Sequence, residues 1–89
     1  MAHTKEEAAE QARADLSARL GGKDVEVESV EQADFPDGAL GAPVEDEMSA
    51  MMITPGWRIR LRAGGRTYEY RANHSQLRLY DFEGENYRI

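Results

Sequence analysis

The stretch FPDGALGAPVEDEMSAMMITPGWRIRLRAGGRTYEY, residues 35–70, decides the fold class of this 89-residue chain. Within it, residues 57–63 alternate between apolar side chains and arginines, which is typical of a β-strand with one buried face. Gly64 and Gly65 follow, and a two-glycine connection favours a tight hairpin. Residues 66–72 then carry tyrosines at alternate positions. The stretch therefore predicts antiparallel strands joined by a hairpin.

Further strands are predicted on both sides of this hairpin. Pro55 and Gly56 suit the two central positions of a type II turn, so we expect a strand to end before them. Residues 34–47 hold two of the three prolines and five acidic residues, and they predict a long loop. Residues 84–89 either fray or add a short edge strand. The predicted strands span about residues 24–30, 48–54, 57–63, 66–72 and 76–82.

A helix is predicted over about residues 4–20. Thr4 and Glu7 have the spacing of a capping box, and small or apolar residues recur at helical spacing up to Leu20. The chain is thus expected to be a single α+β domain, residues 1–89, with an N-terminal helix packed on a four- to five-stranded, mainly antiparallel sheet. The predicted core residues are Leu16, Leu20, Val25, Val27, Met52, Trp57, Ile59, Leu61, Tyr68, Tyr70, Leu77 and Leu79.

Composition excludes several classes of protein. Residues 1–50 hold 4 basic against 13 acidic residues, a net charge of −9, and residues 51–89 hold 7 against 4, a net of +3. The overall charge of −6 argues against nucleic-acid binding, and no apolar run is long enough to span a membrane. The lack of cysteine and of a signal peptide indicates a cytoplasmic protein, whereas removal of an N-terminal export signal would indicate an exported one. We expect a monomer.

Several motifs resemble those of a family of small, uncharacterised bacterial α+β domains. FPDGALGAP, TPGWRIRL and YEYRAN are similar to the family's WPD-SLGCP loop, TPGY-I-L strand and YEYHTD strand. The resemblance covers about residues 12–80 and implies a fold but no activity. This chain has Ala42 and Tyr80 where the family pattern has cysteines. If those cysteines pair, the resemblance implies that an Ala42→Cys, Tyr80→Cys variant forms a disulfide.

The alternating arginines are the sharpest candidate site. Arg58, Arg60 and Arg62 are expected on one sheet face, about 6.5–7 Å apart. Arg66, Arg71 or Arg78 could extend this patch, and Tyr80 could offer a stacking surface. Such a face suits phosphate, an acidic peptide or a single-stranded nucleic acid. The alternative is that the arginines form ion pairs across the sheet, with partners drawn from Glu26, Glu28 and Glu69.

The proline-rich loop is the second candidate site. Phe35, Asp37 and Leu40 could present a surface to a protein partner, because loops on a rigid sheet often carry binding residues. The alternative is that Phe35 and Leu40 anchor the loop by closing the sheet edge.

No catalytic residues, metal ligands or cofactor are predicted. His74 beside Ser75 is typical of a turn, and the acidic run at residues 45–47 lacks the spacing of a calcium loop. The expected function is a non-catalytic binding module that takes a protein or an acidic ligand. Two alternatives remain: a small enzyme with an unrecognised site, and a structural domain excised from a larger protein.

Overall fold

The helix begins where the sequence supplies a complete cap. In the computed structural model, which describes residues 4–89, the Thr4 hydroxyl accepts from the Glu7 amide at 3.1 Å. The Glu7 carboxylate accepts from the Thr4 amide at 2.8 Å, which completes the predicted capping box. The helix α1 runs over Lys5–Arg19 and ends before Gly21 and Gly22, both of which have positive φ.

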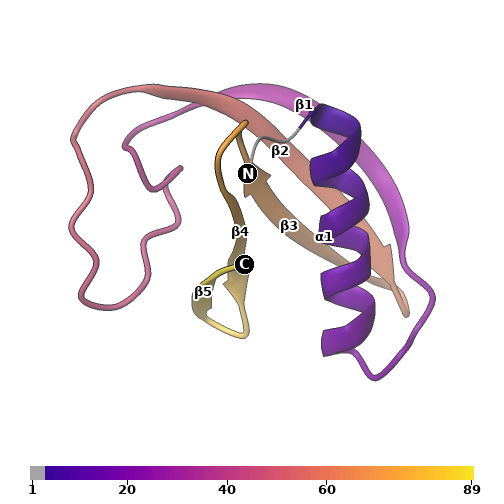
Figure 1. Cartoon of the computed structure of the whole chain (residues 1–89). Helices are drawn as coiled ribbons and strands as arrows, with labels where there is room; N and C mark the ends of the chain where they lie inside the picture. The colour runs from indigo at the N-terminus through magenta and orange to yellow at the C-terminus, as the bar shows by residue number, and fades with distance from the viewer. Residues whose placement is uncertain (1–3) are drawn as a thin grey trace.

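Five antiparallel strands follow the helix in a simple meander. Figure 1 shows α1 lying on one face of the sheet, with a long loop extending away from the body of the domain between β1 and β2. Neighbours in the sheet are neighbours in the chain, and the predicted α+β class is confirmed. The strands are β1 (Glu26–Phe35), β2 (Thr54–Ala63), β3 (Arg66–Ala72), β4 (Leu77–Phe82) and β5 (Glu85–Arg88).

The main core lies between α1 and the sheet. Ala8, Ala12 and Leu16 recur at four-residue spacing, and their small size lets the helix approach the strands closely. Against them pack the inward residues of three strands, all fully or almost fully buried: Ile59, Leu61, Tyr70, Ala72, Leu77 and Leu79. Of the other predicted core residues, five are partly buried against this cluster: Leu20, Val25, Val27, Trp57 and Tyr68.

A polar link ties the helix to the centre of the sheet. The buried Tyr70 hydroxyl donates to the Asp15 carboxylate at 2.6 Å, and Arg19 contacts the same carboxylate at 2.7 Å. Burial, followed by the hydrogen bond to Asp15, raises the pKa of Tyr70 well above its ordinary value. The phenol is therefore a neutral donor, and it fixes the helix over β3.

The first strand contains a bulge that corrects its alternation. The register shifts between Val27 and Ser29, so Glu28 has no direct partner on β2. Without the extra residue Val30 would point away from the helix, but the bulge places it opposite Ile59 and against the main core. A bulge and several glutamates also discourage another chain from pairing with this edge.

Three element predictions were wrong. The first strand does not end near residue 30 but continues to Phe35, and residues 48–53 form no strand. Pro55 and Gly56 form no turn, because they lie inside β2 and pair with the extension of β1. Pro55 is tolerated there because β3 pairs with β2 only from Trp57 onward, so no strand lies on its other side.

These corrections move the long loop to residues 36–53 and expose one predicted core residue. Met52 is 61% exposed, because its segment leaves the sheet instead of joining it. The chain still has five strands, since β5 takes the place of the predicted strand at 48–54. Within the described residues, no helix is long and apolar enough to cross a membrane.

Candidate functional site

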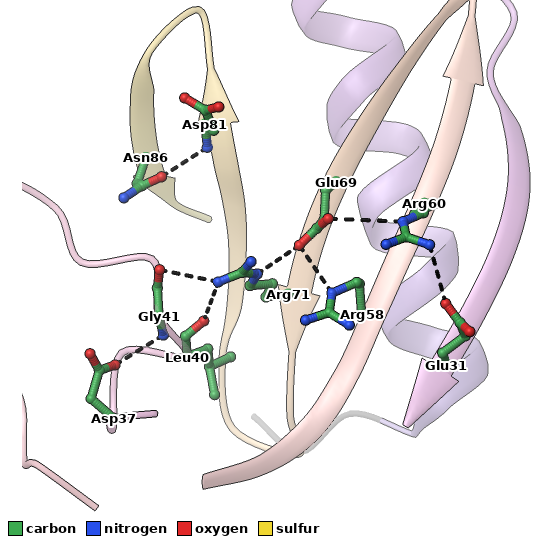
Figure 2. A network of polar contacts seen from close by, with 10 residues as sticks. All are labelled: Glu31, Asp37, Leu40, Gly41, Arg58, Arg60, Glu69, Arg71, Asp81 and Asn86. Atoms are coloured by element: carbon green, nitrogen blue, oxygen red, sulfur yellow. Dashed lines mark hydrogen bonds and ion pairs between the residues drawn. The ribbon is translucent and has the colours of Figure 1, made fainter. Parts of the chain in front are cut away.

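The predicted arginine patch lies on the face of the sheet opposite the helix. Arg58, Arg60 and Arg62 alternate along β2 with Ile59 and Leu61, which face the main core. Figure 2 shows Arg58 and Arg60 in front of the strands and α1 behind them. The pattern read from the sequence therefore separates the two faces correctly.

Each of these arginines has an acidic neighbour. Arg58 Nε lies 3.2 Å from Glu69 Oε2, and Arg60 lies 3.4 Å from Glu31 and 3.9 Å from Glu69. Arg62 Nε lies 3.8 Å from Glu28. Of the expected partners, Glu28 and Glu69 are confirmed and Glu26 is replaced by Glu31. The sheet itself thus supplies the counter-charges for the patch.

A second set of arginines crosses the sheet at right angles to the first. Arg58, Arg71 and Arg78 are paired in register on β2, β3 and β4, and we call them the arginine row. Like charges directly opposite each other destabilise a sheet. The row therefore needs compensation, which Glu69 and the long loop supply.

Arg71, in the middle of the row, contacts a carboxylate, two carbonyl oxygens and two aromatic rings. Arg71 donates to Glu69 at 2.8 Å and to the carbonyl oxygens of Leu40 and Gly41, each at 3.1 Å (Figure 2). Its guanidinium carbon lies 3.7 Å from the centre of the Tyr80 ring and 5.2 Å from that of Phe35. The Tyr80 ring, which was expected to offer a stacking surface to a ligand, is therefore occupied by Arg71 of the same chain.

The end of the row is the most buried cation in the described part of the chain. The Arg78 side chain is only 5% exposed and contacts the Glu47 carboxylate with two nitrogens, the Nη2–Oε2 distance being 2.7 Å. Arg78 also donates to Ala42 O at 3.2 Å and to Gln76 Oε1 at 2.7 Å. The hydrogen bonds from Arg78, chiefly, and from the Val44 amide stabilise the charged carboxylate, so the pKa of Glu47 falls to about 2.

Side chains from the sheet hold residues 36–47, which we call the clamped loop. Gln76 donates to Gly38 O at 2.8 Å, and Asn86 donates to Pro43 O at 2.9 Å. Together with Arg71 and Arg78, these side chains satisfy five loop carbonyls: Gly38, Leu40, Gly41, Ala42 and Pro43. The loop is therefore ordered without strand pairing, because side chains take the place of a neighbouring strand.

The loop residues expected to bind a partner are engaged inside the fold. Phe35 and Leu40 are buried, in agreement with the alternative that they anchor the loop. Leu40 holds a positive φ of 58°, an uncommon conformation for leucine that its burial compensates. The Asp37 carboxylate accepts from the amides of Ala39 and Gly41, both at 2.9 Å, so it organises the turn.

Gly56 shows how closely the two strands and the loop anchor approach. A Cβ atom at this position would overlap the carbonyl oxygen of Ala72 and lie 3.2 Å from the Phe35 ring. Only glycine leaves room there, which explains why Gly56 lies within a strand. The glycine that suggested a turn in the sequence is therefore required by packing.

Beyond the clamped loop, the chain exposes an apolar segment, residues 48–53, which we call the outer arm. Its large apolar residues are mostly exposed to solvent: Met48 97%, Met51 91%, Met52 61% and Ile53 70%. The Gly38 amide donates to Ala50 O at 2.9 Å and holds the middle of the arm against the clamped loop. The arm was missed from sequence because its apolar residues were assigned to a strand.

Open depressions of about 180 to 460 Å³ mark the rest of the described surface. Those of about 380 and 460 Å³ fall within the roughly 300–1,000 Å³ usual for ligand pockets. The one of about 180 Å³ is smaller than that range and is lined by Pro55, Trp57 and His74, among others. Beside it, the Ser75 hydroxyl donates to Asn73 Oδ1 at 3.1 Å, which is a turn contact. Among residues 4–89, no group of three or more His, Asp or Glu side chains is placed to hold a metal ion.

The two positions that carry cysteine in the resembling pattern both border the arginine row. Ala42 is buried, and its carbonyl accepts from Arg78, while the Tyr80 ring lies beside Arg71. A disulfide between the two positions stays a prediction.

The role of Arg71 and Arg78 as clamps was missed, because the carbonyls that they bind lie about 30 residues away in the sequence.

Comparison with known proteins gives a family and no further relative. No curated protein and no solved structure matches the chain. Residues 9–79 match the model of a family described as Domain of unknown function (DUF8738), and the chain therefore belongs to that family.

Proposed function

We propose that this member of the DUF8738 family is a non-catalytic interaction module that contacts a partner protein through the outer arm, residues 48–53. One observation carries the proposal. Four large apolar side chains within six consecutive residues are exposed, and the fold leaves them outside the main core: Met48, Met51, Met52 and Ile53. Contiguous exposed apolar surface on a domain of this size marks a contact site for another molecule.

The other two candidate surfaces are less suited to the same task. Arg58, Arg60 and Arg62 would have to give up their ion pairs with glutamates before they could bind an acidic ligand. Phe35 and Leu40 are buried, so a partner would have to open the clamped loop to reach them. The outer arm needs no such change, because its side chains already face solvent.

Methionine suits this role for a physical reason. Its unbranched side chain has three rotatable bonds and a polarisable sulfur, so it adapts to apolar pockets of different shapes. The clamped loop meanwhile fixes the base of the arm through the bond from Gly38 to Ala50, which lowers the entropy lost on binding. The arm therefore combines an ordered base with adaptable contact residues.

The charges beside the arm indicate the chemistry of the partner. Glu45 and Asp46 are exposed immediately before it, whereas Glu47 is neutralised by Arg78. An apolar groove with a basic rim is complementary to this arrangement. Because six residues bury little area, we expect a weak or transient complex unless further surface joins the contact.

The causes of the pKa shifts in the described residues are also consistent with a non-catalytic role. Strongly shifted pKa values in a cleft are a mark of catalytic residues. Among residues 4–89 the large shifts belong to Glu47, whose pKa is lowered chiefly by hydrogen bonds from Arg78, and to Tyr70, whose pKa is raised by burial and by the hydrogen bond to Asp15. Neither group lines one of the surface depressions described for this fold.

The test is affinity capture from the source cell with three matched baits. The first variant replaces Met48, Met51 and Met52 by serine, the second replaces them by leucine, and the third is Arg58→Gln, Arg60→Gln, Arg62→Gln. Each surface change of this kind alters the free energy of unfolding by about 0.5 kcal/mol or less, so a triple variant loses at most about 1.5 kcal/mol and stays folded. The measurement is the amount of each captured protein relative to the wild-type bait.

We expect the serine variant to lose a partner that the leucine and glutamine variants retain, because leucine preserves apolar area. Direct binding of the purified partner to each bait then gives the affinity. Equal recovery by the serine variant would exclude the outer arm as the contact surface. Loss with the glutamine variant alone would instead assign binding to the arginine face.

A further inference from the structure

We propose that Met48, Met51 and Met52 form a binding site for one soft monovalent cation, Cu(I) or its analogue Ag(I), with the three thioether sulfurs as ligands. The inference is independent of the interaction function, because it depends on sulfur atoms and not on apolar area. It also revises the expectation of no metal site, which considered a calcium site with oxygen ligands and not one with thioether ligands.

The soft ligands of this chain are concentrated in one place. The sequence has no cysteine and four methionines, and three of the four lie within five residues. The fourth, Met1, lies outside the described residues. Cu(I) prefers thiolate and thioether ligands over oxygen, so the outer arm is where such an ion would meet several preferred ligands at once.

The backbone of the arm permits the three sulfurs to converge. Residues 48–51 have no regular structure and residue 52 lies in a bend, so no ladder of hydrogen bonds holds the side chains apart. Four residue steps place the Met48 and Met52 Cα atoms at most about 14 Å apart. Because each methionine has three rotatable bonds, rotation of the side chains brings the sulfurs toward a common point.

The arm has a fixed centre around which this closure takes place. Ala50 is bound through its carbonyl oxygen to the Gly38 amide at 2.9 Å, and the methionines lie on both sides of it in the chain. Its Cβ atom lies 3.8 Å from the position that a Cβ on Gly38 would take, so the anchor is in close contact with the clamped loop. Ion binding therefore needs no change in the main core.

The negative charge around the segment attracts any cation, hard or soft. The thioether ligands then select a soft one. Exposed Glu45 and Asp46 and the overall charge of −6 attract positive ions. Glu47 contributes little, since Arg78 neutralises it and Arg88 lies 3.9 Å away. Two adjacent carboxylates fall short of the six to eight oxygens that Ca²⁺ takes, whereas three thioethers suit Cu(I).

The experiment is a titration of the full chain with silver nitrate in chloride-free buffer. The protein carries ¹³C-labelled methionine methyl groups, and single Met→Leu variants assign the four signals. We expect the signals of Met48, Met51 and Met52 to shift together and to saturate at one Ag(I) per chain. Zn²⁺, which prefers nitrogen and thiolate ligands, should leave these methyl signals unchanged.

Substitutions separate one shared site from three independent contacts. Each single Met→Leu variant should weaken Ag(I) binding at least about tenfold, because it removes one of three ligands from the same ion. His74→Gln, which removes the one histidine of the described residues, should leave the affinity unchanged. Separate saturation of the three signals, or a shift of Met1 at the same concentration, would overturn the proposal.

The triple leucine variant distinguishes this inference from the proposed interaction. It should lose Ag(I) binding and still capture the partner, whereas the triple serine variant should lose both. Retention of Ag(I) affinity by the leucine variant contradicts a thioether site, whatever the outcome of partner capture.

Discussion

The two faces of the sheet are covered in different ways. The helix face is buried by α1 through apolar side chains of regular spacing, with one polar link from Tyr70 to Asp15. The opposite face carries the arginine row and is partly covered by the clamped loop, which has no regular structure of its own. The first face is covered by apolar packing, whereas on the second face charged side chains bind backbone carbonyls of the loop and the Arg60 and Arg62 side chains stay 44% and 58% exposed.

This difference teaches what a small domain can do with a polar sheet face. A loop without strand pairing leaves its carbonyls unsatisfied, and a row of arginines has unpaired donors and repelling charges. Each supplies what the other lacks, because Arg71 and Arg78 bind three loop carbonyls, those of Leu40, Gly41 and Ala42, and Arg78 also pairs with Glu47 of the loop. The two features therefore depend on each other for stability.

The largest expected effect comes from breaking the arginine row at its buried end. Arg78→Met leaves the Glu47 carboxylate in a largely buried site without its partner, and it frees the Ala42 carbonyl. Removing one member of a buried ion pair costs about 3–5 kcal/mol. Urea denaturation of the variant beside wild type measures this loss. A change below about 1 kcal/mol would contradict the dependence of the loop on the row.

The matching change on the helix face is Tyr70→Phe, which removes the hydroxyl that donates to Asp15 at 2.6 Å. A hydrogen bond to a charged group contributes about 1.5–3 kcal/mol, so the free energy of unfolding should fall by that amount. Tyr80→Phe is the control, because it keeps the ring that lies beside Arg71. Equal losses of stability in Tyr70→Phe and Tyr80→Phe would show that the hydrogen bond to Asp15 is not important for stability.

Gly56→Ala tests the close packing of Gly56 against the Ala72 carbonyl and the buried Phe35 ring. The added methyl group meets the Ala72 carbonyl, which is backbone and cannot rotate away, so we expect a loss of about 1–3 kcal/mol. In Gly38→Ala the new methyl lies 3.6 Å or more from its neighbours, and the φ of Gly38 is not positive. Thermal unfolding of the pair should therefore show a lower Tm for the Gly56 variant only.

The pH dependence of stability sharpens the comparison further. The pKa of Glu47 is about 2 in the folded protein and 4.5 ordinarily, so folding favours its charged form. The stabilisation is fully present above pH 4.5 and is lost as the pH falls from 4.5 toward 2. Glu47→Gln should flatten the decline of stability in this window. Parallel curves for the variant and wild type would mean that Glu47 is not linked to folding.

The smallest effect is expected from an exposed ion pair on the same face. Arg62 and Glu28 lie 3.8 Å apart with side chains 58% and 40% exposed. Such pairs contribute about 0–1 kcal/mol and are screened by salt, so Arg62→Gln should change stability little and less still at high ionic strength. A loss of stability as large as that of Arg78→Met would show that the difference in burial does not determine how much Arg62 and Arg78 each contribute.

Much of the helix face could be predicted from sequence, because its signals are local. The capping box at Thr4, the alternation along residues 57–63 and the Gly64-Gly65 hairpin each depend on neighbours a few residues apart. The error at Pro55 and Gly56 has the opposite cause. Those residues resemble a turn, but their pairing with Ala33 and Asp34 depends on a strand more than 20 residues earlier.

The candidate site was predicted less completely for the same reason. The partners Glu28 and Glu69 follow from alternation, and the anchoring of Phe35 and Leu40 was one of two alternatives. The side-chain clamps and the exposed outer arm could not be read from the sequence. They depend on which loop carbonyls reach Arg71 and Arg78, and no periodicity encodes that contact.

The sequence by itself determined the N-terminal helix, the α+β class and the separation of an apolar face from an arginine face, because periodicity and turn chemistry act over short distances. Only the tertiary structure decided where the long loop begins and ends, which carbonyls the arginine row binds and that residues 48–53 stay in solvent. Those features depend on the longer pairing of β1 with β2, which displaces the methionines from the sheet.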